Sequence, residues 1–329
     1  MNKVKVTHIG GGTGSISVLS GLKIYDDLDL SVVVQMSDDG GTAKVIRDEF
    51  GLLPFNDVRK SIIALAGSGN GKFRELFTYR FHQGEGLTDH TVGNLIMMAM
   101  SDITGSEKEA INFVSKLFDC KGNLYPVTFE QAVLIAEYEN GDVVKGEQYI
   151  DVPEVDRKER IKNLYLEPNV KANEDAIKAI LEAEYITIGP GDLYTSVLAN
   201  VVVDGIAQAI KDSKAKIIFI TNLMTENGET RGMTASDTVN EIEKYTGRRP
   251  DYVVVNNGEI ESNIIEWYKK SGESPIQDDI DDDKYTEVVR EDIISKERVK
   301  KVKGDSLARS LVRHDAQKLG RLLYKLITY

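Results

Sequence analysis

Residues 4–15 read VKVTHIGGGTGS and predict a buried strand that runs directly into a glycine turn. Four of the five residues in the turn are glycine, and glycine lets backbone N–H groups approach a ligand closely. Ile16, Leu19 and Leu22 follow at helical spacing, so the turn should lead into the N-terminus of a helix. Helix N-termini attract anions, and the unit therefore predicts a phosphate site. Its candidate residues are Gly10, Gly11, Gly12, Thr13 and Gly14.

The glycine pattern does not by itself identify the ligand. In the dinucleotide motif G-x-G-x-x-G read from Gly10, the third glycine would fall at Ser15. No Gly-Lys-Ser/Thr follows, so the turn is not a P-loop either. His8 lies on the strand, where the alternation places it in the core.

The composition is that of an ordinary globular protein: 329 residues, 41% hydrophobic and 29% charged. A net charge of −12 argues against nucleic acid or an anionic membrane as the main partner. An anionic small ligand would need local positive groups or a divalent metal. The single cysteine, Cys120, excludes an internal disulfide and fits a reducing compartment. There is no apolar signal core and no window near the ~20 apolar residues of a membrane span, so we expect a cytoplasmic protein.

Strand-like and helix-like segments alternate along most of the chain. Apolar strands are expected at 30–36, 183–188, 216–220 and 251–255, and each ends in polar or glycine residues. Helices are expected from the second turn to about residue 50, and at 58–66, 72–82, 95–100 and 308–329. This alternation predicts an α/β fold with a mostly parallel sheet and helices on both faces, in one domain over 1–329.

The middle of the chain follows a different pattern. Strand-like runs at 132–138 and 142–150 flank Glu139-Asn140-Gly141, and Asn-Gly between two such runs is a strong hairpin signal. Residues 161–166 are expected to add a further strand. We therefore expect a small antiparallel β insertion on the main sheet over about 120–170.

Polar side chains cluster in the turns of the first half. Asp38 and Asp39 close the second strand and could hold a divalent metal, bind a ribose or cap the next helix. Asp57 has the same choices, as a cap or as a metal or sugar contact. Arg59 could bind a phosphate bidentately or be a surface helix charge. Asn94 could cap a helix or touch a ligand.

The second half adds two more turns at predicted strand ends. Residues 189–196 read GPGDLYTS and offer Gly189, Gly191, Asp192, Thr195 and Ser196. Asn222 and Thr225 follow the strand at 216–220 and could read a base edge or be ordinary turn residues. Because ligands of open α/β sheets bind at the carboxyl ends of the strands, all these turns should share one crevice. No Ser/His/Asp triad and no zinc-like spacing is visible in the sequence.

Taken in order, the turns resemble one family, the YvcK/CofD-like proteins. The motifs are GGGTG from Gly10, DDGG from Asp38, NDVR from Asn56, HTVGNL from His90, GPGDLYTS from Gly189, TENGET from Thr225 and RHD from Arg313. The resemblance is greater to the gluconeogenesis-factor branch than to the 2-phospho-L-lactate transferases. It implies a Rossmann-like sheet that binds a nucleotide-sugar such as UDP-N-acetylglucosamine or UDP-glucose. It also implies a regulator of cell shape and envelope synthesis on gluconeogenic carbon sources.

Three hypotheses follow. In the first, a UDP-sugar-binding regulator, Gly10–Gly14 hold the diphosphate, Asp38 or Asp39 contacts a sugar, and Arg313 contacts a phosphate or a protein partner. In the second, a Mg²⁺-dependent phospho-group transferase using a guanine nucleotide, Asp38 and Asp57 carry the metal and are the catalytic residues. The third is an NAD-dependent oxidoreductase with Asp38 on the ribose. We also expect a protein partner in envelope synthesis and a homo-oligomer.

Overall fold

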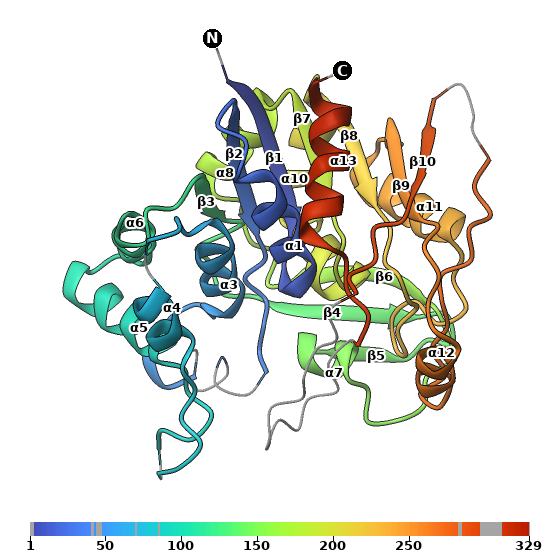
Figure 1. Ribbon diagram of the computed structural model, residues 1–329. Coiled ribbons are helices and arrows are strands. Elements are labelled where there is room, and N and C mark those ends of the chain that lie inside the picture. The colour runs from blue at the N-terminus through green and yellow to red at the C-terminus, as the bar shows by residue number, and fades with distance from the viewer. Residues whose placement is uncertain are drawn as a thin grey trace.

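The computed structural model describes residues 3–40, 43, 48–69, 71–84, 86–281, 285–296 and 311–328 (Figure 1). The strands are β1 Val4–Gly10, β2 Leu28–Val34, β3 Asn123–Pro126, β4 Val133–Tyr138, β5 Val143–Lys145, β6 Ile161–Glu167, β7 Tyr185–Ile188, β8 Lys216–Ile220, β9 Tyr252–Asn256 and β10 Glu287–Glu291. The helices are α1 Gly12–Leu22, α3 Asn56–Leu65, α4 Gly71–Thr78, α5 Val92–Thr104, α6 Glu107–Leu117, α7 Glu147–Asp151, α8 Glu174–Glu182, the π-helical turn η1 Leu193–Leu198, α9 Ala199–Val201, α10 Ile206–Asp212, α11 Ala235–Thr246, α12 Ser262–Lys269 and α13 Ala316–Thr328.

The seven-stranded sheet has the order β10-β9-β8-β7-β1-β2-β3, and all its neighbours pair in parallel. Numbered along the chain, its strands run 3-2-1-4-5-6-7, which extends the Rossmann order by one strand. The predicted α/β, Rossmann-like parallel sheet is therefore confirmed. The direction of winding reverses between β1 and β7, and a ligand is expected outside the carboxyl ends of the strands at such a point.

Helices cover both faces of this sheet, as predicted (Figure 1). On one face α1 packs between α3 and α13, and on the other α10 packs between α8 and α11. The contact of α1 with α13 is close because Gly21 meets Gly320: a Cβ on Gly21 would lie 2.2 Å from the Ala316 carbonyl oxygen. The central strands β7 and β8 and the end of β2 are buried by both layers, which explains their largely apolar sequences.

The predicted antiparallel segment is present, but it is not an insertion on the main sheet. β4, β5 and β6 form a separate three-stranded antiparallel sheet that crosses below the carboxyl ends of the main strands in Figure 1. The prediction began too early, because residues 123–126 are β3 and pair in parallel with β2. The second hairpin strand ends at Lys145, where Gly146, with φ of 103°, turns the chain into α7.

Other expected elements differ mainly in length. Helix α5 is longer than the predicted 95–100, α4 ends at Thr78 rather than residue 82, and α13 begins at Ala316 rather than 308. The helix expected from the second turn to residue 50 falls largely on residues outside the described ones. Among the described helices, none combines the length and apolar character needed to cross a membrane.

Candidate functional site

The glycine turn after β1 meets the Gly-Pro-Gly turn after β7 at the point where the sheet reverses. A Cβ on Gly14 would lie 2.1 Å from the Pro190 carbonyl oxygen, so only glycine lets the first turn of α1 pass this close. Gly12 has φ of 62°, a left-handed conformation that side chains disfavour. The two turns predicted to share a crevice are therefore in contact.

Two carboxylates, those of Asp57 and Asp192, face the glycine turn. A Cβ on Gly11 would lie 2.6 Å from Asp57 Oδ2, and one on Gly12 would lie 3.9 Å from Asp192 Oδ2. The Gly12 N–H donates to Asp57, so this N–H already has an acceptor within the protein. In this structure the turn lets two acidic side chains approach the backbone closely.

Asp57 is held by three donors and does not cap its helix. Lys60 Nζ donates to Oδ1 at 2.8 Å and Gln35 Nε2 donates to Oδ2 at 2.9 Å. Burial alone would raise the pKa of Asp57, but the Lys60 charge and these hydrogen bonds hold it below its usual value. The capping interpretation of Asp57 is wrong, because the N-cap of α3 is Phe55 and no side chain caps it.

A directional chain of hydrogen bonds joins Asp38 to Arg59. Arg59 Nε donates to Asn94 Oδ1 at 3.2 Å, Asn94 Nδ2 donates to Asn56 Oδ1 at 2.8 Å, and Asn56 Nδ2 donates to Asp38 Oδ2 at 2.8 Å. The side chain of Thr91, rather than that of Asn94, caps α5. Predicted site residues from three separate motifs are thus joined in one network. Successive hydrogen bonds in such a chain polarise one another and become stronger.

The two ends of this chain are a half-buried carboxyl, Asp38, and a buried guanidinium, Arg59. Burial, and then the Asp57 charge, raises the pKa of Asp38. Burial lowers the pKa of Arg59 to about 10, and the charge of Arg80 adds to this effect against the opposing charge of Asp57. Arg59 is 8% exposed, so its interpretation as a surface helix charge is wrong.

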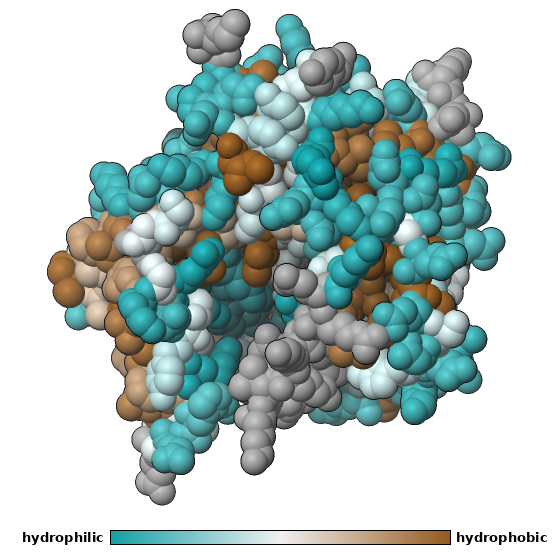
Figure 2. All heavy atoms as spheres, in the orientation of Figure 1, coloured by the Kyte–Doolittle hydropathy of each residue, from teal (hydrophilic) through white to brown (hydrophobic). Residues whose placement is uncertain are grey.

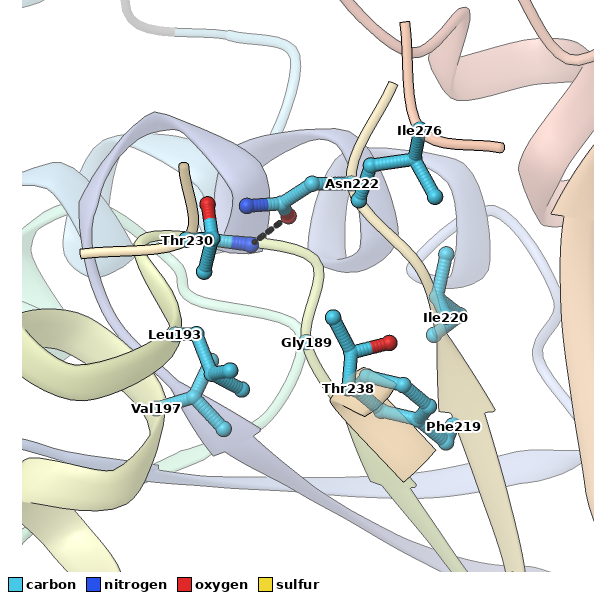
Figure 3. A pocket seen from close by; sticks show the side chains of 10 residues that line it. Gly189, Leu193, Val197, Phe219, Ile220, Asn222, Thr230, Thr238 and Ile276 are labelled. Carbon is cyan, nitrogen blue, oxygen red and sulfur yellow. Dashed lines mark hydrogen bonds between the residues drawn. The ribbon is translucent and has the colours of Figure 1, made fainter. Parts of the chain in front are cut away.

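The Gly-Pro-Gly turn after β7 is fixed by Asn222, whose Oδ1 accepts from the Gly191 N–H at 3.0 Å (Figure 3). The adjoining cavity, lined by Gly189, Leu193 and Thr230 among others, measures about 10 Å³. That is about the volume of one water, so in this state no base fits beside Asn222. Thr225 is 1% exposed and its hydroxyl accepts from the Ser274 N–H at 2.9 Å. In this structure both side chains hold the turns in place.

Two glutamates that the sequence reasoning did not single out lie behind η1. Glu229 accepts from the Tyr194 N–H at 2.8 Å and from the Thr195 hydroxyl at 2.5 Å. Burial, and then the Asp192 charge, raises the pKa of Glu229, and the same two causes raise that of Glu226. A signal for them was present in TENGET, a turn with two acids after a buried strand.

Other predicted residues have structural partners too. Ser196 donates to Asp192 Oδ2 at 3.2 Å. Asp39 accepts from the Gln148 N–H at 2.9 Å, and this bond joins the turn after β2 to α7. Arg313 precedes α13, and its carbonyl accepts from the Ser295 N–H at 2.8 Å. The structure therefore brings Asp39 to the small sheet and leaves Arg313 on the segment leading into α13.

His8 is in the core as predicted, but with a role that the alternation did not reveal. Its Nε2 lies 2.8 Å from the Ser15 hydroxyl and its Nδ1 lies 3.0 Å from the Thr187 hydroxyl. The Ser15 hydroxyl also lies 3.0 Å from the Gly11 carbonyl oxygen, so the imidazole is joined to the glycine turn through Ser15. Burial lowers the pKa of His8 to about 3. The neutral imidazole therefore braces the glycine turn from beneath.

The carboxylates do not form a ready cation site. The oxygens of Asp38 accept from Gly40 N and Asn56 Nδ2, and those of Asp57 are engaged as described. Within the described part of the chain, no group of three or more His, Cys, Asp or Glu is arranged to hold a metal ion. As placed, these side chains do not fit a magnesium ion.

In the view of Figure 1, the molecular surface is hollowed beside the α4–α5 arm, and the floor of the hollow is hydrophilic (Figure 2).

Comparison with known proteins identifies the family. The sequence profile described as "2-phospho-L-lactate transferase CofD" matches residues 6–294. The chain belongs to the CofD family. A protein of Bacillus subtilis named "Gluconeogenesis factor" is 36% identical over 329 residues, covering 99% of this chain and 98% of that protein. One of the same name from Halalkalibacterium halodurans is 37% identical over 278 residues, 84% of each.

A solved structure agrees with the sequence relatives. The crystal structure of a UPF0052 family member from Bacillus halodurans superimposes with a TM-score of 0.86 at 32% identity, covering 98% of this chain and 99% of that one. The CofD-family fold therefore extends across the whole described chain, and the resemblance inferred from the turn motifs is confirmed.

Proposed function

We propose that this protein is a regulator that binds a nucleotide-sugar such as UDP-N-acetylglucosamine or UDP-glucose. The observation that carries the proposal is the pairing of unlike groups at one point of the sheet. Asp38 and Asp57 are acceptors for hydroxyl groups, and Arg59, joined to Asp38 through two amides, is a buried guanidinium suited to a phosphate. A nucleotide-sugar presents both kinds of group in one molecule.

The regulatory role is supported by the names of the relatives. It is also supported by the described site residues, among which no acid, base or nucleophile is evident. Two relatives that align with most of this chain are named gluconeogenesis factors. The carboxylates nearest the glycine turn are bonded to protein donors, and the buried imidazole of His8 is braced between two hydroxyls. We propose that ligand occupancy is reported to a protein partner in envelope synthesis during growth on gluconeogenic carbon.

Thermal melting with a panel of ligands tests the proposal. We expect UDP-N-acetylglucosamine or UDP-glucose to raise the melting temperature without added metal, and NAD to have no effect. Asp57→Asn should abolish the shift, because it removes a hydroxyl acceptor and releases Lys60. Glu154→Gln on the surface is the matched carboxylate-to-amide control. Failure of both UDP-sugars to bind in calorimetry would contradict the proposal.

A second candidate is a phospho-group transferase that uses a guanine nucleotide with Mg²⁺. The observation favouring it is the match of the 2-phospho-L-lactate transferase profile to residues 6–294. A melting shift seen with GDP and Mg²⁺, absent without the metal and absent for both UDP-sugars, would favour this function over the first.

A further inference from the structure

Arg59 is a buried cation without an acidic partner. It is 8% exposed, and its one side-chain hydrogen bond to the described residues is from Nε to an amide oxygen, that of Asn94. Among the described residues no carboxylate forms an ion pair with it, since the neighbouring Lys60 is the one that pairs with Asp57. A buried charge left unpaired is strongly destabilising, so a site of this kind calls for an anion.

A second arginine stands at the same place. Arg80 forms an isolated antiparallel bridge with Thr91, the N-cap of α5. Its guanidinium donates to the Asp89 carbonyl and, within the described chain, has no carboxylate partner. Its charge is close enough to lower the pKa of Arg59, so the two cations act on each other without an anion between them.

The start of α5 adds further positive character. A Cβ on Gly93 would lie 2.6 Å from Arg59 Cδ, so the Arg59 side chain passes directly over the first turn of this helix. That turn has no acidic residue to offset the positive end of the helix dipole. His90, which precedes the N-cap, is 9% exposed, and its Nδ1 is buried with no hydrogen-bond partner. A buried polar atom without a partner requires an explanation in a native structure.

The glycine turn offers a phosphate a less favourable place. Asp57 takes the Gly12 N–H, and the Asp192 carboxylate stands beside Gly12. Two carboxylates there would repel a diphosphate. We propose that Arg59, Arg80 and His90, with the N-terminus of α5, form a subsite for a phosphate or diphosphate group. The inference builds on the proposed nucleotide-sugar function, in which it assigns the phosphates to the α3–α5 side and the hydroxyls to the carboxylates.

Calorimetry with inorganic pyrophosphate and with UDP-N-acetylglucosamine tests the subsite. The main variant is Arg80→Gln, because Arg80 is only half-buried and its loss leaves the core intact. The control is Lys72→Gln on α4, whose side chain is 93% exposed and pairs with Glu75. A lost charge-assisted contact to phosphate is expected to weaken pyrophosphate binding about 10- to 100-fold. Lys72→Gln should leave binding within about twofold, as expected for an exposed pair.

The two ligands separate this inference from the proposed function. If pyrophosphate binds and Arg80→Gln weakens it while UDP-N-acetylglucosamine does not bind at all, the subsite stands and the nucleotide-sugar function falls. If UDP-N-acetylglucosamine binds equally well to wild type and Arg80→Gln, the subsite is overturned and the function stands. Absence of pyrophosphate binding to the wild-type chain also overturns the subsite. The affinity for uridine, which lacks phosphate, should be the same for wild type and Arg80→Gln.

Discussion

Gly14, in the first turn of α1, is the residue at which the glycine turn after β1 meets the Gly-Pro-Gly turn after β7. An added Cβ would lie 2.1 Å from the Pro190 carbonyl oxygen and 2.9 Å from the Gly191 nitrogen, both of them backbone atoms that cannot rotate away. Gly14→Ala should therefore push the two turns apart and destabilise the fold by about 1–3 kcal/mol, the usual range for overpacking. Urea denaturation measures the loss, and ligand calorimetry should show weakened binding as well.

The control for this change is Gly71→Ala at the start of α4, where an added Cβ would meet nothing within 4 Å. Alanine favours a helix over glycine by up to about 1 kcal/mol, so this variant should be neutral or slightly stabilised. Equal behaviour of the two variants would show that the close approach of the turns carries no energy.

At the scale of elements, the hydroxyl of Tyr138 joins the small sheet to the loop behind η1. Tyr138 on β4 is fully buried and donates to the Gly228 carbonyl at 3.1 Å, within the loop that carries Glu226 and Glu229. Tyr138→Phe keeps the ring but leaves that carbonyl without its partner, at a cost of about 1–2 kcal/mol. Hydrogen exchange in residues 225–230 should become faster.

Tyr165→Phe on β6 provides the matched comparison, because its side chain is 43% exposed and no hydrogen bond of its hydroxyl is observed. It should change neither stability nor exchange in the loop. If Tyr138→Phe behaves in the same way, the small sheet does not hold the acidic loop in place.

How far the sequence predicts these elements depends on whether the signal is local. The turn at Gly10–Gly14, the hairpin at Glu139–Gly141 and the strand at 216–220 could be predicted because glycine content and alternation are local properties. The placement of β3 could not, since its four residues have a strand partner, β2, that lies about ninety positions away in the chain. Contacts such as Gly21 with Gly320 are invisible to periodicity for the same reason.

The same limit applies to the site. The sequence presents Asp38, Arg59 and Asn94 as separate residues of three motifs, and the structure joins them in a network that passes through Asn56. The sequence offered no means to see that Lys60 takes Asp57, or that His8 supports the glycine turn through Ser15. Side-chain partners depend on the register between elements, which single-chain patterns do not encode.

For the molecule as a whole, acids buried in the site should make stability depend on pH. Burial and neighbouring carboxylates raise the pKa values of Glu226 and Glu229, so the folded state keeps protons that the unfolded chain has lost above its glutamate pKa of about 4.3. Stability therefore falls as pH rises toward the folded-state values. His8 and His314 act in the opposite sense, since burial lowers their pKa values to about 3 and about 4. Their effect fades above the unfolded-state pKa of about 6.5 and is small about one pH unit higher, where both are largely neutral in either state.

Between pH 6.5 and 8 the carboxyl effect should thus dominate, and the free energy of unfolding should decrease as pH rises. Each group contributes at most about 1.4 kcal/mol per pH unit. Glu226→Gln removes one such group and keeps its shape, so the variant should be more stable than wild type at pH 8, with the difference shrinking toward pH 6.5. Urea denaturation at the two pH values measures this, with Glu154→Gln on the surface as the control. A wild-type stability that is flat over this range, or a Glu226→Gln variant less stable at pH 8, would show that the buried acids are relieved by groups outside this cluster.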